Sequence, residues 1–304
     1  MNGTLNVSLA PHIHAKSSTQ SVMLDVIIAL LPATIAAIVL FGLPALWIIL
    51  TCVATTVLSE FLFNLCCKRK QTIFDLSAVV TGLLLALNLS TKVPLWQCVI
   101  GSVFAIIVVK CLFGGIGKNI VNPAIAARVF MLLTFAAVAG GANPIIPEIE
   151  AGSTPLENIE AFSLLDLFLG RHGGSIGETC ALALLIGYAY LVIRGTIKWY
   201  VPVAFILPVF FGFLIVSGSF TIALSHVLAG GLLLGAIFMA TDYVTTPSNS
   251  LGRVIFCLGA GLITFLIRQY GSFPEGVSIS ILAMNLLTPL IEKITTPRTL
   301  GGIR

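Results

Sequence analysis

The stretch SVMLDVIIALLPATIAAIVLFGLPALWIILTCVATTVLSEFLFNLC, from Ser21 to Cys66, gives the clearest indication of the fold class. It contains two apolar runs, 21–41 and 44–66, which meet at Phe41-Gly42-Leu43-Pro44. A helix that crosses a bilayer needs about 20 apolar residues, so each run is long enough to span a membrane. Because glycine and proline at the junction favour a tight turn, the stretch predicts a transmembrane helical hairpin.

The rest of the chain repeats this pattern. Eight further apolar runs lie at 73–89, 95–113, 122–141, 179–194, 199–217, 221–240, 252–269 and 277–292. Of the 304 residues, 58% are hydrophobic and 9% are charged, whereas soluble domains carry about 25% charged residues. The predicted fold class is therefore an all-α integral membrane protein with about ten transmembrane helices. The net charge of +4 is small and no basic helix with interleaved aromatic residues occurs, so no nucleic-acid partner is expected.

Lysine and arginine positions predict the orientation. With the N-terminus inside, thirteen of the sixteen lysines and arginines lie on or near the cytoplasmic side, and Lys92, Arg171 and Arg268 lie outside. Both termini are then cytoplasmic. The predicted segments are a cytoplasmic N-terminal segment (1–20), a first five-helix half (21–141), an extracytoplasmic loop (142–178), a second five-helix half (179–292) and a cytoplasmic tail (293–304). An odd number of helices per half predicts two inverted repeats.

The first polar block is FGGIGKNIVNPAIAARVF, Phe113 to Phe130. Its glycines permit a sharp turn or a close approach, and Pro123 can begin a helix. Polar side chains surround that helix start: Lys118, Asn119, Asn122 and Arg128. An anion or a polar ring bound at the helix N-terminus is one interpretation. A tight turn with a capping asparagine and a snorkelling arginine is the other.

The second polar block is MATDYVTTPSNSLGRVIF, Met239 to Phe256, also predicted to be cytoplasmic. It is dense in hydroxyl and amide groups and includes Thr241, Asp242, Thr245 and Thr246. This composition suits the edges of a flavin or quinone ring, and it suits a capped loop equally well.

Three acids lie at membrane depth: Asp25, Glu60 and Asp75. Carboxylates in such positions mark ion paths, proton relays or partner salt bridges. Asp75 can instead cap the helix that starts with FDLSAVVTG. The seven cysteines contain no CxxC pair and fit buried thiols; a cluster ligand shared with a partner protein is an alternative for Cys111 or the pair Cys66–Cys67.

The predicted external loop contains EAGSTPL, Glu150 to Leu156. Gly152 and Pro155 place the hydroxyls of Ser153 and Thr154 on a turn. The loop has one histidine, His172, distant in sequence, so Thr154 has no adjacent base that would make it a nucleophile. A hydroxyl that receives a covalent group from another enzyme needs only exposure and a turn, which this loop provides.

The chain resembles the family of D subunits of Rnf electron transport complexes and B subunits of sodium-pumping NADH:quinone oxidoreductases. The likeness covers nearly the whole chain. It rests on four blocks in order: GGIGKNIVNPAIAARVF from Gly114, GSIGETCALALLIG from Gly174, FMATDYVTTPSNSLGRVIF from Phe238 and FPEGVSISILAMNLLTPLI from Phe273.

The resemblance implies a covalent flavin. In this family a threonine that ends the sequence Asp-x-x-Ser/Thr-Gly-Ala-Thr carries FMN through a phosphoester bond. Thr154 aligns with that threonine, Gly152 matches, and Glu148 stands at the acid position. Ala151 and Ser153 depart from the pattern, and Ser153 is a neighbouring hydroxyl that competes for the assignment.

The resemblance also implies function and partners. The complex exchanges electrons between ferredoxin and NAD, and couples this to Na⁺ or H⁺ movement across the bacterial cytoplasmic membrane. This chain would be a subunit that cannot act alone. It would work with the A, B, C, E and G subunits, in contact with lipid, after modification by a flavin transferase. A second, noncovalent flavin (riboflavin) is implied, and the polar residues of the two blocks are the candidates for its pocket.

Two other classes of function remain open from the residues. Ten spans, two halves and buried acids also fit a secondary transporter or channel with no redox cofactor. A membrane scaffold would need neither flavin nor a particular residue at position 154. Fluorescence from a covalently bound flavin would distinguish a redox subunit from both the transporter or channel and the scaffold.

Overall fold

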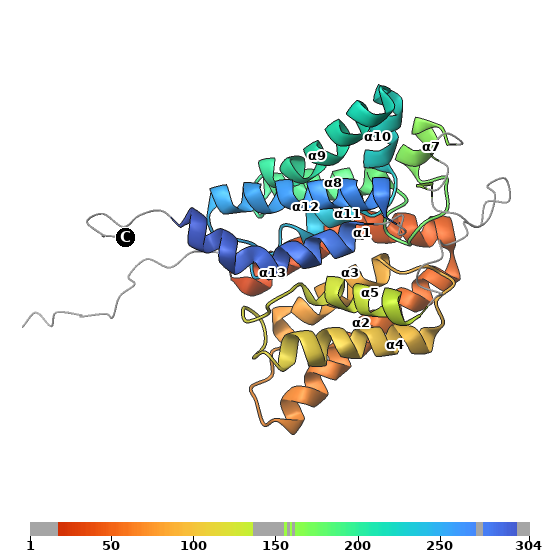
Figure 1. Ribbon diagram of the computed structural model, residues 1–304. Helices are drawn as coiled ribbons and strands as arrows, with labels where there is room; N and C mark the ends of the chain where they lie inside the picture. The colour runs from red at the N-terminus through yellow and green to blue at the C-terminus, as the bar shows by residue number, and fades with distance from the viewer. Residues whose placement is uncertain (1–17, 136–154, 157–158, 160–161, 272–275, 297–304) are drawn as a thin grey trace, which may run out of the picture.

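The regular elements of the computed structural model are helices throughout the residues that it describes, which are 18–135, 155–156, 159, 162–271 and 276–296 (Figure 1). The predicted fold class is confirmed, and the chain is a multi-pass membrane protein. In Figure 1, the start of α1 and the end of α13 lie at one end of the helix bundle and α7 lies at the other end.

The predicted hairpin is the first feature of the fold. Helix α1 (Thr19–Phe41) begins where the Ser18 side chain accepts a hydrogen bond from the Ser21 N–H, and α2 (Leu43–Cys66) follows directly. Gly42 joins them with φ of 68°, a positive value that glycine adopts without strain. Pro44 lies in the first turn of α2, where its missing N–H costs nothing.

The other helices follow in the predicted order. The first half continues with η1 (Ile73–Asp75), α3 (Ser77–Leu87), α4 (Leu95–Val103) with its π-helical extension η2 (Phe104–Cys111), and α5 (Pro123–Thr134). The second part contains α7 (Leu164–Leu169), α8 (Ala181–Ile193), α9 (Tyr200–Ser217), α10 (Phe220–Leu228), α11 (Leu232–Leu234), η4 (Gly235–Met239), α12 (Ser250–Tyr270) and α13 (Val277–Thr295). Each of the ten predicted runs carries one of these helices or two or three consecutive ones.

Helix length alone supports fewer full spans than ten. Five described helices (α1, α2, α9, α12 and α13) are long and apolar enough to cross a membrane. The pair of α10 with α11–η4, bent by 63°, would be a sixth span, and four of the remaining apolar helices are shorter. The count of ten transmembrane helices therefore stays a prediction.

Helix pairing follows the two predicted halves. In the first, α2 packs on α3 and α4; in the second, α9 packs on α10 and α12. Equivalent helices of the two halves also pack on each other, α1 on α8 and α5 on α13. Such pairing is what two inverted repeats would produce, and the repeat itself stays a prediction.

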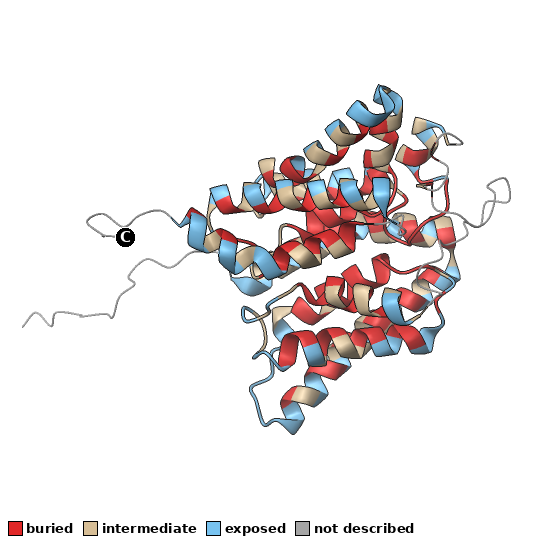
Figure 2. Cartoon of the chain, in the orientation of Figure 1, coloured by how far each residue is buried: buried red, intermediate tan, exposed pale blue. Residues whose placement is uncertain are grey.

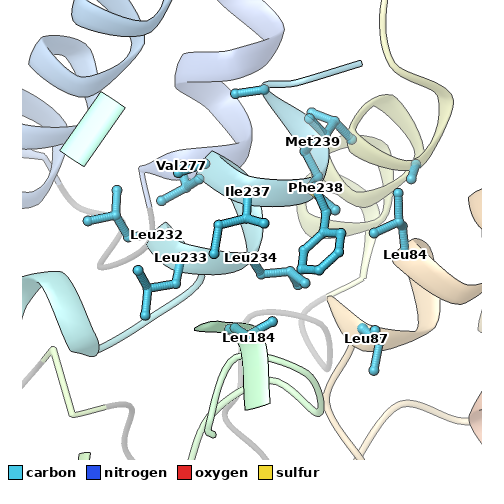
Figure 3. Packing of buried hydrophobic residues seen from close by; sticks show 14 of the residues in the cluster. Leu84, Leu87, Leu184, Leu232, Leu233, Leu234, Ile237, Phe238, Met239 and Val277 are labelled. Carbon is cyan, nitrogen blue, oxygen red and sulfur yellow. The ribbon is translucent and has the colours of Figure 1, made fainter. Parts of the chain in front are cut away.

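The core lies where the two halves meet. Buried residues face the inside of the bundle and exposed ones cover its outside (Figure 2). Many exposed side chains are apolar, such as Val39, Ile215 and Ile294, which is expected where lipid is the solvent. Figure 3 shows Leu234 and Phe238 of α11 and η4 close to Leu84 and Leu87 of α3, so the core joins both halves.

The end of the predicted external loop differs from a solvated loop. Residues 172–179 are buried although they form no helix. The backbone N–H groups of Ile176 and Gly177 donate to the carbonyls of Leu89 and Leu87 at 2.9 and 2.7 Å. Helix α3 ends at Leu87, and the last carbonyls of a helix lack partners within it. The segment therefore lies inside the bundle, where its N–H groups provide hydrogen-bond donors for carbonyl groups at and just after the end of α3.

Candidate functional site

A cavity lies between the two halves of the bundle. The empty space that it encloses, including space open to solvent, is about 770 Å³. Both polar blocks contribute to its wall: Ile116, Asn119, Asn122 and Pro123 from the first, and Thr241, Asp242, Tyr243 and Val244 from the second. The remaining wall is mostly apolar and comes largely from α1, α3, α8 and η4. Two segments far apart in sequence thus form one site.

The first block enters the wall through its asparagines. Asn122 caps α5: its Oδ1 accepts from Ala124 N at 3.0 Å and Ile125 N at 3.4 Å. The capping interpretation of the sequence is therefore confirmed, and the capping residue also lines the cavity. The Oδ1 of Asn119 is buried and has no hydrogen-bond partner among the described residues. An unpaired buried acceptor at a cavity wall favours a ligand with a donor.

The second block holds Asp242 in place. Asp242 Oδ1 accepts from Val244 N at 3.2 Å, and Oδ2 accepts from Thr245 Oγ1 at 3.0 Å. Burial raises the pKa of the Asp242 carboxyl above its ordinary value, and these two hydrogen bonds oppose that rise. The Thr241 hydroxyl donates to the Ile237 carbonyl at 2.6 Å, which leaves its oxygen as an acceptor toward the cavity.

Helix α13 ties the two blocks together. In its hydrogen-bonded orientation, the Asn285 amide donates to the Thr245 carbonyl at 3.2 Å and accepts from the Asn122 N–H at 3.1 Å. The Thr288 hydroxyl also donates to the Thr245 carbonyl, at 2.9 Å. These buried bonds fix the spacing of the cavity wall. Neither Asn285 nor Thr288 was identified from the sequence, because their spacing on a helix resembles that of ordinary interior residues.

Four predicted site residues do not line this cavity. Lys118 is exposed on its turn. Arg128 is buried, with 3% exposure, and donates to Ser175 Oγ at 3.4 Å in the buried segment, so the snorkelling interpretation was wrong. Thr245 and Thr246 are buried beneath the wall, where both hydroxyls donate to Asp242.

The predicted covalent site is not part of this geometry. Gly152, Ser153 and Thr154 lie outside the described residues. Their assignment continues to rest on the sequence motif.

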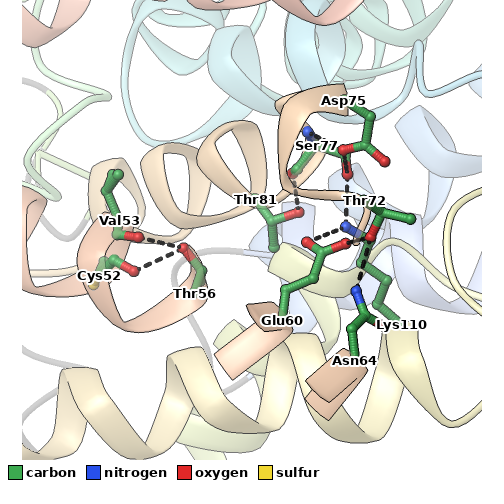
Figure 4. A network of polar contacts seen from close by, with 10 residues as sticks. All are labelled: Cys52, Val53, Thr56, Glu60, Asn64, Thr72, Asp75, Ser77, Thr81 and Lys110. Atoms are coloured by element: carbon green, nitrogen blue, oxygen red, sulfur yellow. Dashed lines mark hydrogen bonds and ion pairs between the residues drawn. The ribbon is translucent and has the colours of Figure 1, made fainter. Parts of the chain in front are cut away.

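Two of the predicted membrane acids, Glu60 and Asp75, belong to one hydrogen-bonded network beside the cavity, which is buried at Glu60, Ser77 and Lys110 and exposed at Thr72 (Figure 4). Lys110 Nζ lies 2.7 Å from Glu60 Oε2 and donates to Ser77 Oγ at 2.6 Å. Ser77 Oγ donates in turn to Asp75 Oδ1, and Thr72 Oγ1 donates to Glu60 Oε1, both at 2.5 Å. Lys110 and Ser77 line the cavity, so the network reaches its wall.

Asp75 lies one residue before Leu76, the N-cap residue of α3, which has no side-chain cap hydrogen bond, so Asp75 contacts the start of the helix without being its N-cap. Its Oδ1 accepts from the Ser77 N–H at 2.9 Å, at the first residue of α3. Lys110 was not identified from the sequence as a site residue. The available signal was a lysine inside an apolar run, which at the end of a span is usually explained by snorkelling.

Asp25 makes a separate set of contacts. It is buried on α1 and accepts from Tyr190 at 3.0 Å and from Arg194 Nε at 3.2 Å. Thr196, which lines the cavity, donates to the same carboxylate at 3.4 Å. The structure therefore does not connect Asp25 to Glu60 through the hydrogen bonds that it describes.

The cysteines form no cluster in the part of the chain that is described. Cys66 and Cys67 are exposed, Cys111 is buried, and all seven thiols are free. The described residues contain no group of three or more His, Cys, Asp or Glu side chains that could hold a metal ion.

The arrangement suits a planar ligand with polar edges. Apolar contact comes from side chains such as Val26, Leu84 and Phe238. Donors and acceptors at the rim come from the polar residues Asn119, Asn122, Thr241 and Asp242. Apolar walls with a few placed polar groups are typical of sites that bind and orient a cofactor.

Comparison with protein families gives one match over almost the entire chain. Residues 6–301 match the model of the NQR2, RnfD, RnfE family.

Curated relatives are similar over nearly their full lengths. The D subunit of the Na(+)-translocating ferredoxin:NAD(+) oxidoreductase complex of Acetobacterium woodii is 46% identical, over 98% of this chain and 95% of the relative. The D subunit of the proton-translocating ferredoxin:NAD(+) oxidoreductase complex of Clostridium ljungdahlii is 37% identical, over 98% and 96%. The D subunit of the ion-translocating oxidoreductase complex of Stutzerimonas stutzeri is 36% identical, over 94% and 93%.

Proposed function

The chain belongs to the NQR2, RnfD, RnfE family, and on this basis we propose that it is the D subunit of an ion-translocating ferredoxin:NAD(+) oxidoreductase complex. Its role is to carry flavin within the membrane part of the complex. The observation that carries this role is the single cavity formed by two polar blocks distant in sequence.

A covalent FMN at Thr154 is the first part of the proposal. It rests on the motif from Glu148 to Thr154 and requires a flavin transferase as an earlier partner. The positive-inside count supports a location of this motif outside the cytoplasmic membrane, with both termini inside. The A, B, C, E and G subunits of the complex are the other proposed partners, together with membrane lipid.

A noncovalent flavin, riboflavin, in the cavity is the second part. The residues present fit it: Asn119 Oδ1 is a buried acceptor in need of a donor, and the apolar wall suits the faces of a ring. When bound, an isoalloxazine ring supplies electron transfer that no protein side chain here provides. Asn122, Thr241 and Asp242 orient its edges, and the surrounding apolar residues limit the access of water.

Filling the cavity is expected to remove this flavin selectively. In Thr241→Trp, the indole ring occupies ligand space, so the affinity for riboflavin falls by about tenfold or more, equivalent to about 1.4 kcal/mol. Flavin released by acid from the purified protein and measured by fluorescence checks the result.

Thr221→Trp provides the matched control. Thr221 is exposed at the start of α10, away from the cavity, so the same substitution there should leave the extractable flavin unchanged. Equal flavin content in both variants would argue against the cavity as the binding site.

An ion path through Asp25, Glu60 and Asp75 is a third part of the proposal. Its support is the burial of Asp25 and Glu60 and the hydrogen-bonded link from Glu60 to Asp75 beside the cavity. Asp25→Asn, Glu60→Gln and Asp75→Asn are made one at a time in the complex. At least one is expected to lower Na⁺ or H⁺ uptake into vesicles per electron transferred. Unchanged coupling in all three would exclude these acids from the path.

A further inference from the structure

Lys110 is a charged group that the proposed function leaves without a role. It lies in the π-helical segment η2, and its side chain is 2% exposed. It is the only basic residue in the wall of the cavity as described. π-Helical turns are rare and often occur at functional sites, and a charged group at this depth is costly unless it is used.

The hydrogen bonds of Lys110 leave one donor available. Its ammonium group has three N–H donors. Among the described residues, two of them have acceptors: Glu60 Oε2 at 2.7 Å and Ser77 Oγ at 2.6 Å. Since Lys110 itself lines the cavity, the third N–H is available to a ligand there.

The charges around Lys110 have opposing signs. Glu60 contacts the ammonium directly, and Asp75 is linked to it through Ser77. Glu60 and Asp75 lie behind the cavity wall, and among the wall residues described the one carboxyl is that of Asp242. The carboxylate of Glu60 partly cancels the positive charge of Lys110. The electrostatic potential at a ring bound in the cavity therefore depends on both members of the pair.

We propose that Lys110 raises the reduction potential of the flavin in this cavity, and that Glu60 limits the size of this effect. The inference rests on the proposed noncovalent flavin. A ring that takes one electron from a donor and no proton gains one negative charge. A buried cation at its edge stabilises that charge, because electrostatic interactions are strong where water is excluded. Lys110 is thus a positioning residue, and its loss changes the reduction potential of the bound flavin.

A structural role for the ion pair makes a different prediction. If the pair only holds α2 against η2, loss of either partner should weaken the fold in the same way. If the pair tunes a flavin, the two losses should move its potential in opposite directions. The signs of the two shifts therefore distinguish the two roles.

The test uses the full chain, purified in detergent from a host without flavin transferase and supplied with riboflavin, so that only noncovalent flavin titrates. Redox titration with dithionite as reductant, followed by the absorbance of the bound flavin, gives the potential. Lys110→Gln should make the one-electron reduction about tenfold less favourable, a shift of about 59 mV to lower potential. Glu60→Gln should shift it to higher potential. Lys110→Arg, which keeps the charge, should stay close to the unmodified chain.

Each outcome decides a separate question. Potentials that do not move, or that move in the same direction in Lys110→Gln and Glu60→Gln, would overturn the tuning role while leaving the flavin site intact. An unmodified chain that binds no riboflavin would overturn the flavin site and this inference with it. If Lys110→Gln does not fold, a higher potential in Glu60→Gln with an unchanged one in Lys110→Arg supports the inference, and no rise in Glu60→Gln overturns it.

Discussion

Replacement of Thr154 by alanine is expected to remove all acid-stable flavin from the chain. A phosphoester needs a hydroxyl oxygen, and alanine has none, so the transferase has no acceptor at this position. The chain is expressed with a flavin transferase, denatured in acid, separated on a gel and viewed under ultraviolet light. The unmodified chain should give a fluorescent band, and Thr154→Ala should give none.

Ser153→Ala is the matched control for this experiment, since it removes the neighbouring hydroxyl and restores the alanine of the family motif. Its band should keep full intensity. A band that persists in Thr154→Ala and disappears in Ser153→Ala would move the attachment to Ser153. An unmodified chain without fluorescence would remove the covalent flavin from the proposal and favour the transporter or channel interpretation.

Gly261→Ala is expected to destabilise the fold strongly. Gly261 lies on α12 where it crosses α9, and an added Cβ would collide with the backbone carbonyl of Phe205 and lie 3.1 Å from Pro208. A helix backbone cannot retreat as a side chain can, so overpacking should cost about 3 kcal/mol. The gain in helix propensity offsets only about 1 kcal/mol of this. The melting temperature in detergent, followed by size-exclusion chromatography, should fall by about 5 °C or more.

Gly259→Ala, two positions before Gly261 on the same helix, is the control. Its added Cβ would meet only the end of the Met284 side chain, at 2.7 Å from Cε. Methionine adapts its shape readily, so the melting temperature should change little. Equal losses of stability at both positions would show that the close α9–α12 contact is not the cause.

Part of the fold could be read directly from the sequence. The two apolar runs around Gly42 and Pro44 predicted the first hairpin, and α1 and α2 have nearly the predicted bounds. Asn122 followed by Pro123 predicted the start of α5, and the structure confirms the cap. These features are local, because capping and turn formation depend on residues a few positions apart.

The broken and short helices could not be read in the same way. Residues 221–240 form one apolar run, yet α10 and α11–η4 are bent by 63°. The hydropathy of a run shows that it can lie in lipid, but it does not show whether the helix stays straight or bends. The buried segment 172–179 likewise has the sequence of a polar loop, and its place in the interior depends on distant contacts with the end of α3 and with Arg128 of α5.

The sequence predicted part of the candidate site. Density of polar groups identified both blocks, and Asn119, Asn122, Thr241 and Asp242 do share a cavity wall. The same criterion also selected Thr245 and Thr246, which lie beneath the wall, and Arg128, which contacts Ser175. Composition shows that polar groups must find partners, but it does not show which ones they find.

Hydropathy and helix caps are properties of neighbouring residues, so the order of residues was enough to identify a helical membrane protein with two polar blocks at helix boundaries; the assignment of Thr154 stays a prediction. That the two blocks form one cavity, and that Lys110 in its wall pairs with Glu60 behind it, became apparent from the packing of the helices. The physical reason is that a buried charge is stable only beside a partner held in place, and helix packing brings together partners that lie far apart in the chain.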